Sequence, residues 1–208
     1  MKAGRQVKVK ICGITDAAIA LAAVEAGADA LGFVFAASRR RVSPEAARDI
    51  CKRLPQGVAR VGVFVNTPPA EVAAVAAYCG LTAVQLSGDE PPGYRLPSPL
   101  PVIRAIRVGN GRGVPDLSRY KVDAFLFDTY REGSYGGTGR VFDWQILRNI
   151  YCPKPLILAG GLCAANVVEA VRAVKPYAVD VSGGVETGGR KDVHKIKQFI
   201  NLAKGVVI

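Results

Sequence analysis

Eight short apolar runs, four to seven residues long, alternate with helical patterns along this chain of 208 residues. The runs cover residues 7–11, 30–35, 60–65, 82–86, 102–106, 122–128, 156–159 and 178–182. Each run is followed by a helical pattern or by a segment that has room for a short helix. Strands that alternate with helices pair in parallel through right-handed crossovers. Eight such units predict an α/β fold, namely a single-domain (β/α)8 TIM barrel with parallel strands over residues 1–208.

Apolar residues at helical spacing support the segments between the runs. The clearest sets are Ile19, Ala22, Ala23 and Ala26; Ala47, Ile50, Cys51 and Leu54; Val72, Val75, Ala76 and Cys79; and Ile196, Phe199, Ile200 and Ala203. Ser43 followed by Pro44 is typical of a helix N-terminus. The main alternative is an open, doubly wound sheet. The first run leads into Cys12-Gly13-Ile14-Thr15 rather than into a GxGxxG loop, which favours the barrel.

Composition restricts the partners of this chain. The net charge of +11 is compatible with nucleic-acid binding, but the basic residues are scattered and form no aromatic-interleaved stripe. We therefore expect no nucleic-acid partner, and a small anionic substrate that the positive charge attracts. No run of 18 uncharged apolar residues exists, so we expect no membrane partner. Five cysteines without a CxxC pair indicate a cytoplasmic protein with no disulfide framework and no metal site.

The active site of a (β/α)8 barrel lies at the C-terminal ends of its strands. Two neighbouring runs end in paired glycines, and these turns comprise Gly160, Gly161, Ser182, Gly183 and Gly184. Glycines let backbone N–H groups approach a phosphate closely. The simpler interpretation is a pair of tight turns without a ligand, but two pairs at adjacent strand ends favour a phosphate site.

Two strand ends carry groups that exchange protons. Cys12 ends the first run and is a candidate base, although most free cysteines are small core residues. It would need a pKa lowered by nearby positive charge. Strand alternation allows Lys10 to share its face, at a distance that the sequence does not fix. Asp128 ends the sixth run, where an apolar setting would raise its pKa and make it a proton donor, unless it only caps a turn. One of the three consecutive arginines at 39–41 is a candidate ligand for a substrate carboxylate. The glycine-rich loop 130–139 is a candidate lid over the substrate.

Several motifs occur together and in a fixed order. They are Lys-Ile-Cys-Gly-Ile-Thr at 10–15, Gly-Phe-Val-Phe at 32–35, Val-Gln-Leu at 84–86, Asp-Thr at 128–129, Gly-Gly-Thr-Gly at 136–139, Leu-Ala-Gly-Gly-Leu at 158–162 and Val-Asp-Val-Ser at 179–182. In this combination the chain resembles the phosphoribosylanthranilate isomerase family of tryptophan biosynthesis. The resemblance implies an Amadori rearrangement that uses no metal and no organic cofactor. N-(5-phospho-β-D-ribosyl)anthranilate would become 1-(2-carboxyphenylamino)-1-deoxy-D-ribulose 5-phosphate.

The resemblance also implies roles for individual residues. The implied acid is Asp128, the implied base is Cys12, and Arg40 would face the anthranilate carboxylate. Gln85 and Asp180 would contact the substrate, and the glycine turns would bind its phosphate. The chain would be a monomer or a homodimer.

Two positions depart from the family pattern. Ser87 stands where the family usually has histidine, and Gly183 where it often has a second serine. Another phosphosugar barrel, such as indole-glycerol-phosphate synthase, is an alternative, but it would be expected to use lysine and glutamate at its strand ends.

Overall fold

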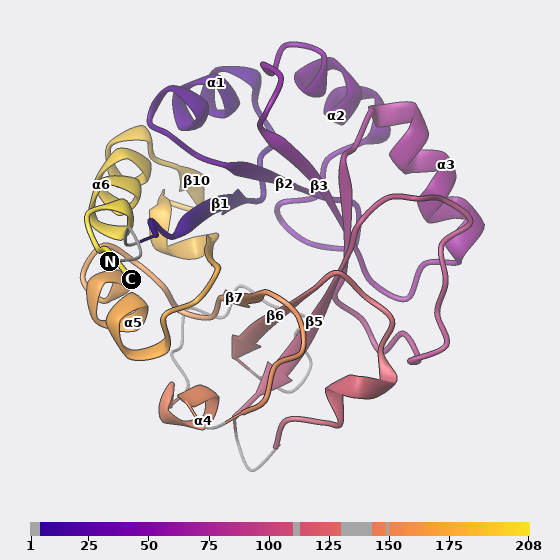
Figure 1. The fold of residues 1–208 in the computed structure, drawn as a ribbon. Coiled ribbons are helices and arrows are strands. Elements are labelled where there is room, and N and C mark those ends of the chain that lie inside the picture. Colours follow the sequence, from indigo (N-terminus) through magenta and orange to yellow (C-terminus); the bar gives the residue numbers. More distant parts are fainter. Residues whose placement is uncertain (1–4, 110–112, 130–142, 149) are drawn as a thin grey trace.

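The computed structural model describes residues 5–109, 113–129, 143–148 and 150–208. Eight parallel strands close into a barrel in which each strand pairs with its neighbours in sequence, and β1 pairs with β8 (Figure 1). The strands are β1 (Lys8–Cys12), β2 (Ala30–Val34), β3 (Ala59–Phe64), β4 (Ala83–Leu86), β5 (Val102–Val108), β6 (Ala124–Thr129), β7 (Leu156–Leu158) and β8 (Ala178–Val181). The predicted (β/α)8 barrel is therefore confirmed.

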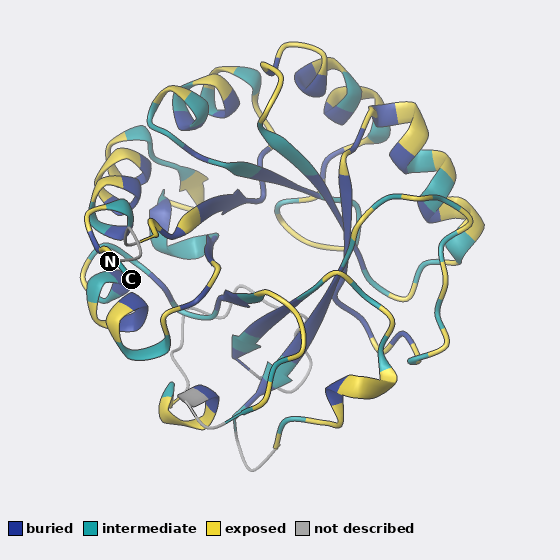
Figure 2. Cartoon of the chain, viewed as in Figure 1, coloured by how far each residue is buried: buried dark blue, intermediate teal, exposed yellow. Residues whose placement is uncertain are grey.

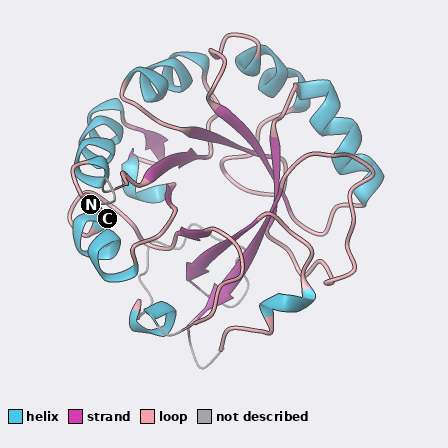
Figure 3. Ribbon diagram, viewed as in Figure 1, coloured by secondary structure: helices cyan, strands magenta, loops and turns pink. Residues whose placement is uncertain are grey.

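Helices surround most of the barrel (Figure 3). They are α1 (Ala17–Glu25), α2 (Pro44–Cys51), α3 (Pro69–Cys79), α4 (Gln145–Arg148), α5 (Val167–Val174) and α6 (Val193–Lys204), with the 3-10 turns η1 (Leu117–Arg119) and η2 (Gly183–Val185). A small hairpin, β9 (Glu186–Thr187) and β10 (Arg190–Lys191), follows β8. No helix connects β4 to β5, because the intervening segment contains several prolines that cannot donate backbone hydrogen bonds.

Strand alternation creates two apolar layers. Figure 2 shows that the strands and the helix faces turned toward them are the most buried parts of the chain. Inside the barrel, small and branched side chains from alternate strand positions form one cluster, with Val61, Ile103, Leu126 and Ile157 among its members. The residues between them point outward and join the larger cluster beneath the helices. Because successive side chains of a strand point to opposite faces, each inward position near a strand's C-terminal end points into the mouth of the barrel.

Local sequence signals account for most helix boundaries. Ser43 caps α2, where its hydroxyl accepts the Ala46 N–H at 3.2 Å, and Pro44 is the first helical residue as expected. The inward face of α1 differs from the prediction. Ala20 and Ala23 are fully buried, whereas Ile19 and Ala22 are only partly buried. This helix is apolar on nearly all sides, so its periodicity does not single out one face.

A buried ion pair lies beside the connection from β4 to β5, which contains no helix. Arg104 of β5 pairs with Glu90, and both side chains are almost inaccessible to water. The same carboxylate accepts backbone N–H groups of Asn66 at 2.9 Å and Gly88 at 3.2 Å. Arg104 also lies over the ring of Tyr120. These contacts tie the loops after β3 and β4 to β5 without a helix. Within the described part of the chain, no helix combines the length and apolar character that a membrane span requires.

Candidate active site

Polar side chains replace the apolar interior at the C-terminal ends of five strands. Lys10 and Cys12 on β1, Gln85 on β4, Arg107 on β5, Asp128 on β6 and Asp180 on β8 alternate in sequence with residues of the outer layer. They therefore point into the barrel mouth. The thiol and the carboxyl that the sequence proposes as base and acid are brought to the same end of the same barrel.

A cavity of about 300 Å³ opens between the ends of β6, β7 and β8. Its walls combine acidic side chains with glycine-rich turns: Asp128, Ala159, Gly160, Gly161, Leu162, Cys163, Asp180, Ser182, Gly183 and Gly184. All five residues that the sequence assigned to a phosphate site therefore line one cavity. The proposed acid lies in its wall.

Two of these glycines admit no side chain. Gly160 has a φ of +86°, and a Cβ there would overlap Thr129 Oγ1 and lie 3.0 Å from Asp128 Oδ1. A Cβ on Gly184 would overlap the Leu162 carbonyl oxygen. The close approach of these turns gives the cavity its shape and holds the turn after β7 against the proposed acid.

Asp128 has the proton affinity of an acid catalyst. Burial raises its pKa from 3.8 to about 6, and the nearby Asp180 carboxylate raises it as well. Three contacts oppose this rise: a hydrogen bond from the Thr129 N–H at 2.7 Å, and the charges of Lys10 and Arg107. A minor fraction of Asp128 therefore still carries a proton near neutral pH.

Cys12 does not have, in the resting site, the lowered pKa that a thiolate base would need. Burial raises the pKa of its thiol above the usual value. The Lys10 ammonium opposes the rise through its charge and a hydrogen bond, and Lys191 opposes it through its charge. Lys10 Nζ also donates to Asp180 Oδ1 at 2.9 Å, and both partners are almost fully buried. Lys10 and Cys12 therefore share one face of β1, as strand alternation allows, and their side chains are close enough to form a hydrogen bond.

The remaining predicted substrate ligands lie at different depths. Arg40 is held by Glu186 at the rim, beside the turn after β8. It also lines a larger cavity of about 680 Å³ between the β1–α1 loop and the β9–β10 hairpin. Gln85 is buried, and its Nε2 donates to Ser87 Oγ at 3.0 Å. Gln85 Oε1 has no hydrogen-bond partner within the described part of the chain.

Three charged residues near the site were not predicted from the sequence as site residues. Arg107 was missed because β5 extends two residues beyond the predicted run, and it pairs in register with Asp128. Glu186 and Lys191 come from the hairpin after β8, where they form a buried ion pair at 2.9 Å. The signal available for both was their position in the last loop at the barrel mouth, since loops after the strands carry the functional groups in this fold.

Other predictions concern residues outside the site. The glycine-rich loop 130–139 lies outside the described residues. His194 is exposed in the first turn of α6. All five cysteines are free thiols. Across the described ranges, no cluster of three or more His, Cys, Asp or Glu side chains is arranged to hold a metal ion.

The closed parallel barrel, with a perturbed carboxyl group and a glycine-lined cavity at its strand ends, defines an enzyme of the (β/α)8 class. A family model for N-(5'phosphoribosyl)anthranilate (PRA) isomerase matches residues 9–202. The chain belongs to this family and is a phosphoribosylanthranilate isomerase of tryptophan biosynthesis.

Individual relatives support the assignment. The N-(5'-phosphoribosyl)anthranilate isomerase of Desulforudis audaxviator is 54% identical over 199 residues, which cover 94% of this chain and 97% of that protein. The enzyme of Geobacter sulfurreducens is 53% identical over 201 residues, covering 96% and 99%. The crystal structure of the Thermotoga maritima enzyme matches with a TM-score of 0.84 at 44% identity, covering 96% of this chain and all of that one. A phosphoribosyl anthranilate isomerase in complex with reduced 1-(o-carboxyphenylamino)-1-deoxyribulose 5-phosphate matches with a TM-score of 0.81 at 44% identity, with the same coverage.

Proposed function

We propose that Asp128 is the general acid and Cys12 the general base in the conversion of N-(5-phospho-β-D-ribosyl)anthranilate to 1-(2-carboxyphenylamino)-1-deoxy-D-ribulose 5-phosphate. One observation carries this assignment. Both groups lie beside the buried Lys10–Asp180 ion pair, since the charges of both partners act on the pKa of Asp128 and on that of Cys12. An acid and a base beside one ion pair can both reach one sugar.

In the first step, Asp128 gives its proton to the ribose ring oxygen. The bond between C1 and that oxygen breaks, and the nitrogen lone pair forms the C1=N bond of a cationic Schiff base. The acid must be protonated beforehand. With a pKa of about 6, about one molecule in ten is protonated at pH 7. An anionic substrate in the cavity raises this share further, because negative charge disfavours the carboxylate.

In the second step, the Cys12 thiolate removes the proton from C2. The electrons of the broken C–H bond form a C1=C2 bond and neutralise the nitrogen, which gives an enolamine. A proton then adds to C1 while the C2 hydroxyl loses its proton, so that C2 becomes a ketone. The proton that Cys12 took replaces the one that Asp128 gave up, so that atoms and charge balance over the whole isomerisation. The Schiff-base cation lowers the pKa of the Cys12 thiol in the same way as Lys10 does. Ring opening therefore makes the base available for the next step.

The other groups bind and orient the substrate. The glycine turns after β7 and β8 would hold the phosphate in the 300 Å³ cavity. Arg40 at the rim would take the anthranilate carboxylate through paired hydrogen bonds. Gln85 and Asp180, which both point into the mouth, would contact the sugar hydroxyls.

The assignment is tested by measuring the rate of phosphoribosylanthranilate conversion by the wild type, Cys12→Ala and Asp128→Asn. Both variants should lose at least about a thousandfold in kcat, because each step would lack its proton carrier. Circular dichroism should show an intact fold, and inorganic phosphate should still bind. Full activity of Cys12→Ala would remove the base assignment, and an unchanged rate for Asp128→Asn would mean that another acid acts.

A further inference from the structure

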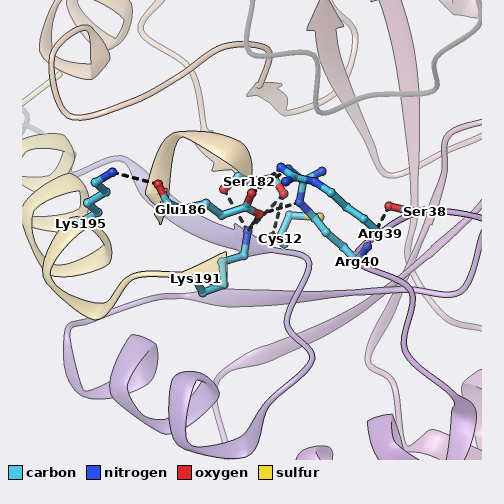
Figure 4. A network of polar contacts seen from close by, with 8 residues as sticks. All are labelled: Cys12, Ser38, Arg39, Arg40, Ser182, Glu186, Lys191 and Lys195. Atoms are coloured by element: carbon cyan, nitrogen blue, oxygen red, sulfur yellow. Dashed lines mark hydrogen bonds and ion pairs between the residues drawn. The ribbon is translucent and has the colours of Figure 1, made fainter. Parts of the chain in front are cut away.

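Glu186 lies at the centre of a polar network on the β8 side of the barrel mouth (Figure 4). Its Oε1 accepts Arg40 Nε at 2.6 Å and Lys191 Nζ at 2.9 Å. Its Oε2 accepts Arg40 Nη2 at 3.1 Å and Arg39 Nη2 at 2.6 Å. One carboxylate, only 5% exposed, is therefore shared by three cationic side chains.

The charge of Glu186 is fixed over the working pH range. Burial alone would raise its pKa, but hydrogen bonds from Arg40 and Lys191 lower it to about 2. The Glu186 carboxylate is therefore ionised near neutral pH. The four charged side chains, Arg39, Arg40, Lys191 and Glu186, sum to +2, so the network favours an anionic ligand at its edge.

One arm of the network positions Arg40. Its side chain runs against Gly13, the residue after the proposed base, where a Cβ would overlap Arg40 Cδ. The Glu186 carboxylate accepts hydrogen bonds from one side of the guanidinium, from Nε and from one hydrogen of Nη2. A guanidinium has five N–H donors, so Glu186 accepts no hydrogen bond from the edge formed by Nη1 and the second hydrogen of Nη2. That edge can donate two parallel hydrogen bonds to a second carboxylate, which is the bidentate geometry typical of arginine.

The other arm of the network positions the turn after β8. Lys191 Nζ donates to the Ser182 carbonyl at 2.9 Å and reaches Ser182 Oγ at 3.3 Å, besides its bond to Glu186. Three acceptors match the three hydrogens of an ammonium group. Ser182 Oγ in turn donates to the Cys12 carbonyl at 3.0 Å. The proposed phosphate turn is thereby linked to the strand end that carries the proposed base.

We propose that Glu186 is a positioning residue that aligns the carboxylate-binding and phosphate-binding ends of the substrate site with each other. Through Arg40 it sets the edge that receives the anthranilate carboxylate. Through Lys191 it fixes the turn at Ser182 that borders the phosphate cavity. The inference rests on the substrate roles proposed above for Arg40 and for the glycine turns. It predicts that loss of the carboxylate weakens binding at both ends of the substrate together.

The test compares Glu186→Gln with Asp29→Asn. Asp29 is a matched control, because its carboxylate also serves two lysines, Lys8 at 2.9 Å and Lys204 at 2.8 Å, and one backbone N–H. It precedes β2 and so lies at the opposite, N-terminal end of the barrel. Steady-state kinetics gives kcat and KM, and calorimetry gives the dissociation constants of inorganic phosphate and of anthranilate as separate probes of the two ends.

We expect Glu186→Gln to raise KM about tenfold and to weaken both probes severalfold, while kcat falls less than about threefold. Asp29→Asn should lower the melting temperature but leave KM and both dissociation constants unchanged. The inference is wrong if Glu186→Gln binds both probes like the wild type, or if it weakens them no more than the control does. A loss of kcat at constant KM would also overturn it, because it would assign Glu186 to the chemistry.

A second variant keeps the inference testable if Glu186→Gln does not fold. Lys191→Met removes the contacts of the network with Ser182 and keeps those between Glu186 and Arg40. It should weaken inorganic phosphate severalfold and leave anthranilate unchanged, whereas equal losses for both probes, or none, would contradict the two-arm arrangement. Because the probes bind without turnover, these results are separate from the proposed function, which fails if the wild type does not convert phosphoribosylanthranilate.

Discussion

Asp128→Asn should make the folded protein more stable at neutral pH while it removes the proposed acid. The asparagine side chain is nearly isosteric, and its Oδ1 can still accept the Thr129 N–H that Asp128 accepts at 2.7 Å. Burial raises the pKa of Asp128 from 3.8 to about 6, so ionisation at pH 7 costs free energy in the folded state. The rise corresponds to about 3 kcal/mol as an upper bound. Asp128 is partly exposed at the mouth, so solvent screening reduces the expected gain to about 1–2 kcal/mol.

The pH dependence fixes the sign of this effect. The folded-state pKa is raised, so the unfolded chain loses its proton first as the pH increases. The cost to the wild type is absent below pH 3.8, grows between pH 3.8 and about 6, and is complete above that. The variant should therefore match the wild type near pH 4 and exceed it at pH 8. A gain of this size corresponds to a rise in Tm of about 2–8 °C for a chain of this length.

Urea unfolding followed by circular dichroism at pH 4, 5.5, 7 and 8 measures the difference directly. Asp49→Asn serves as the control, because Asp49 is 72% exposed on α2 and its nearest cation, Lys52, lies 3.9 Å away. That substitution should change the free energy of unfolding by less than about 0.5 kcal/mol at every pH. If Asp128→Asn is no more stable than the wild type at pH 8, the carboxyl group is not desolvated and cannot be the poised acid described above.

Three further substitutions test neighbouring parts of the site. Arg40→Ala should raise KM about tenfold by removing the carboxylate contact, and steady-state kinetics that show an unaltered KM would transfer this role to Arg39 or Arg41. Arg107→Met removes a cation that lowers the pKa of Asp128, so the acidic limb of the kcat/KM profile should move to higher pH. A limb that stays in place would mean that the charge of Arg107 does not act on Asp128. Gly160→Ala should abolish phosphate binding measured by calorimetry, because its Cβ would overlap Thr129, and retained affinity would place the phosphate elsewhere.

The barrel could be predicted because its evidence is local and repeated. Each strand and helix unit carries its own apolar pattern, and the order of the units fixes parallel pairing. Cys12 and Asp128 could be singled out because each ends such a run. The inward face of α1 could not, because a helix that is apolar on nearly all sides has no distinct stripe. Arg107 was missed because charged residues are rare inside strands, so a run of apolar letters is read as ending before it.

The partners of the site residues could not be predicted, because they meet only after the barrel closes. Lys10 finds Asp180 across 170 residues of sequence, and Arg40 finds Glu186 across 146. No local pattern records such a contact. The pKa of Cys12 shows the same limit, because the sequence indicates that a lysine is near but not how strongly burial opposes it.

The buried Lys10–Asp180 ion pair acts on both the proposed acid and the proposed base. Such pairs contribute little to stability, because desolvation offsets their attraction. Here each charge acts most on one neighbour. Lys10 lowers the pKa of Cys12 more than Asp180 raises it, and Asp180 raises the pKa of Asp128 more than Lys10 lowers it. The pair therefore brings the two pKa values closer together, which increases the share of molecules with a protonated acid and an ionised base. Apolar residues of similar volume could fill the same space, but they would leave the acid more ionised and the base more protonated.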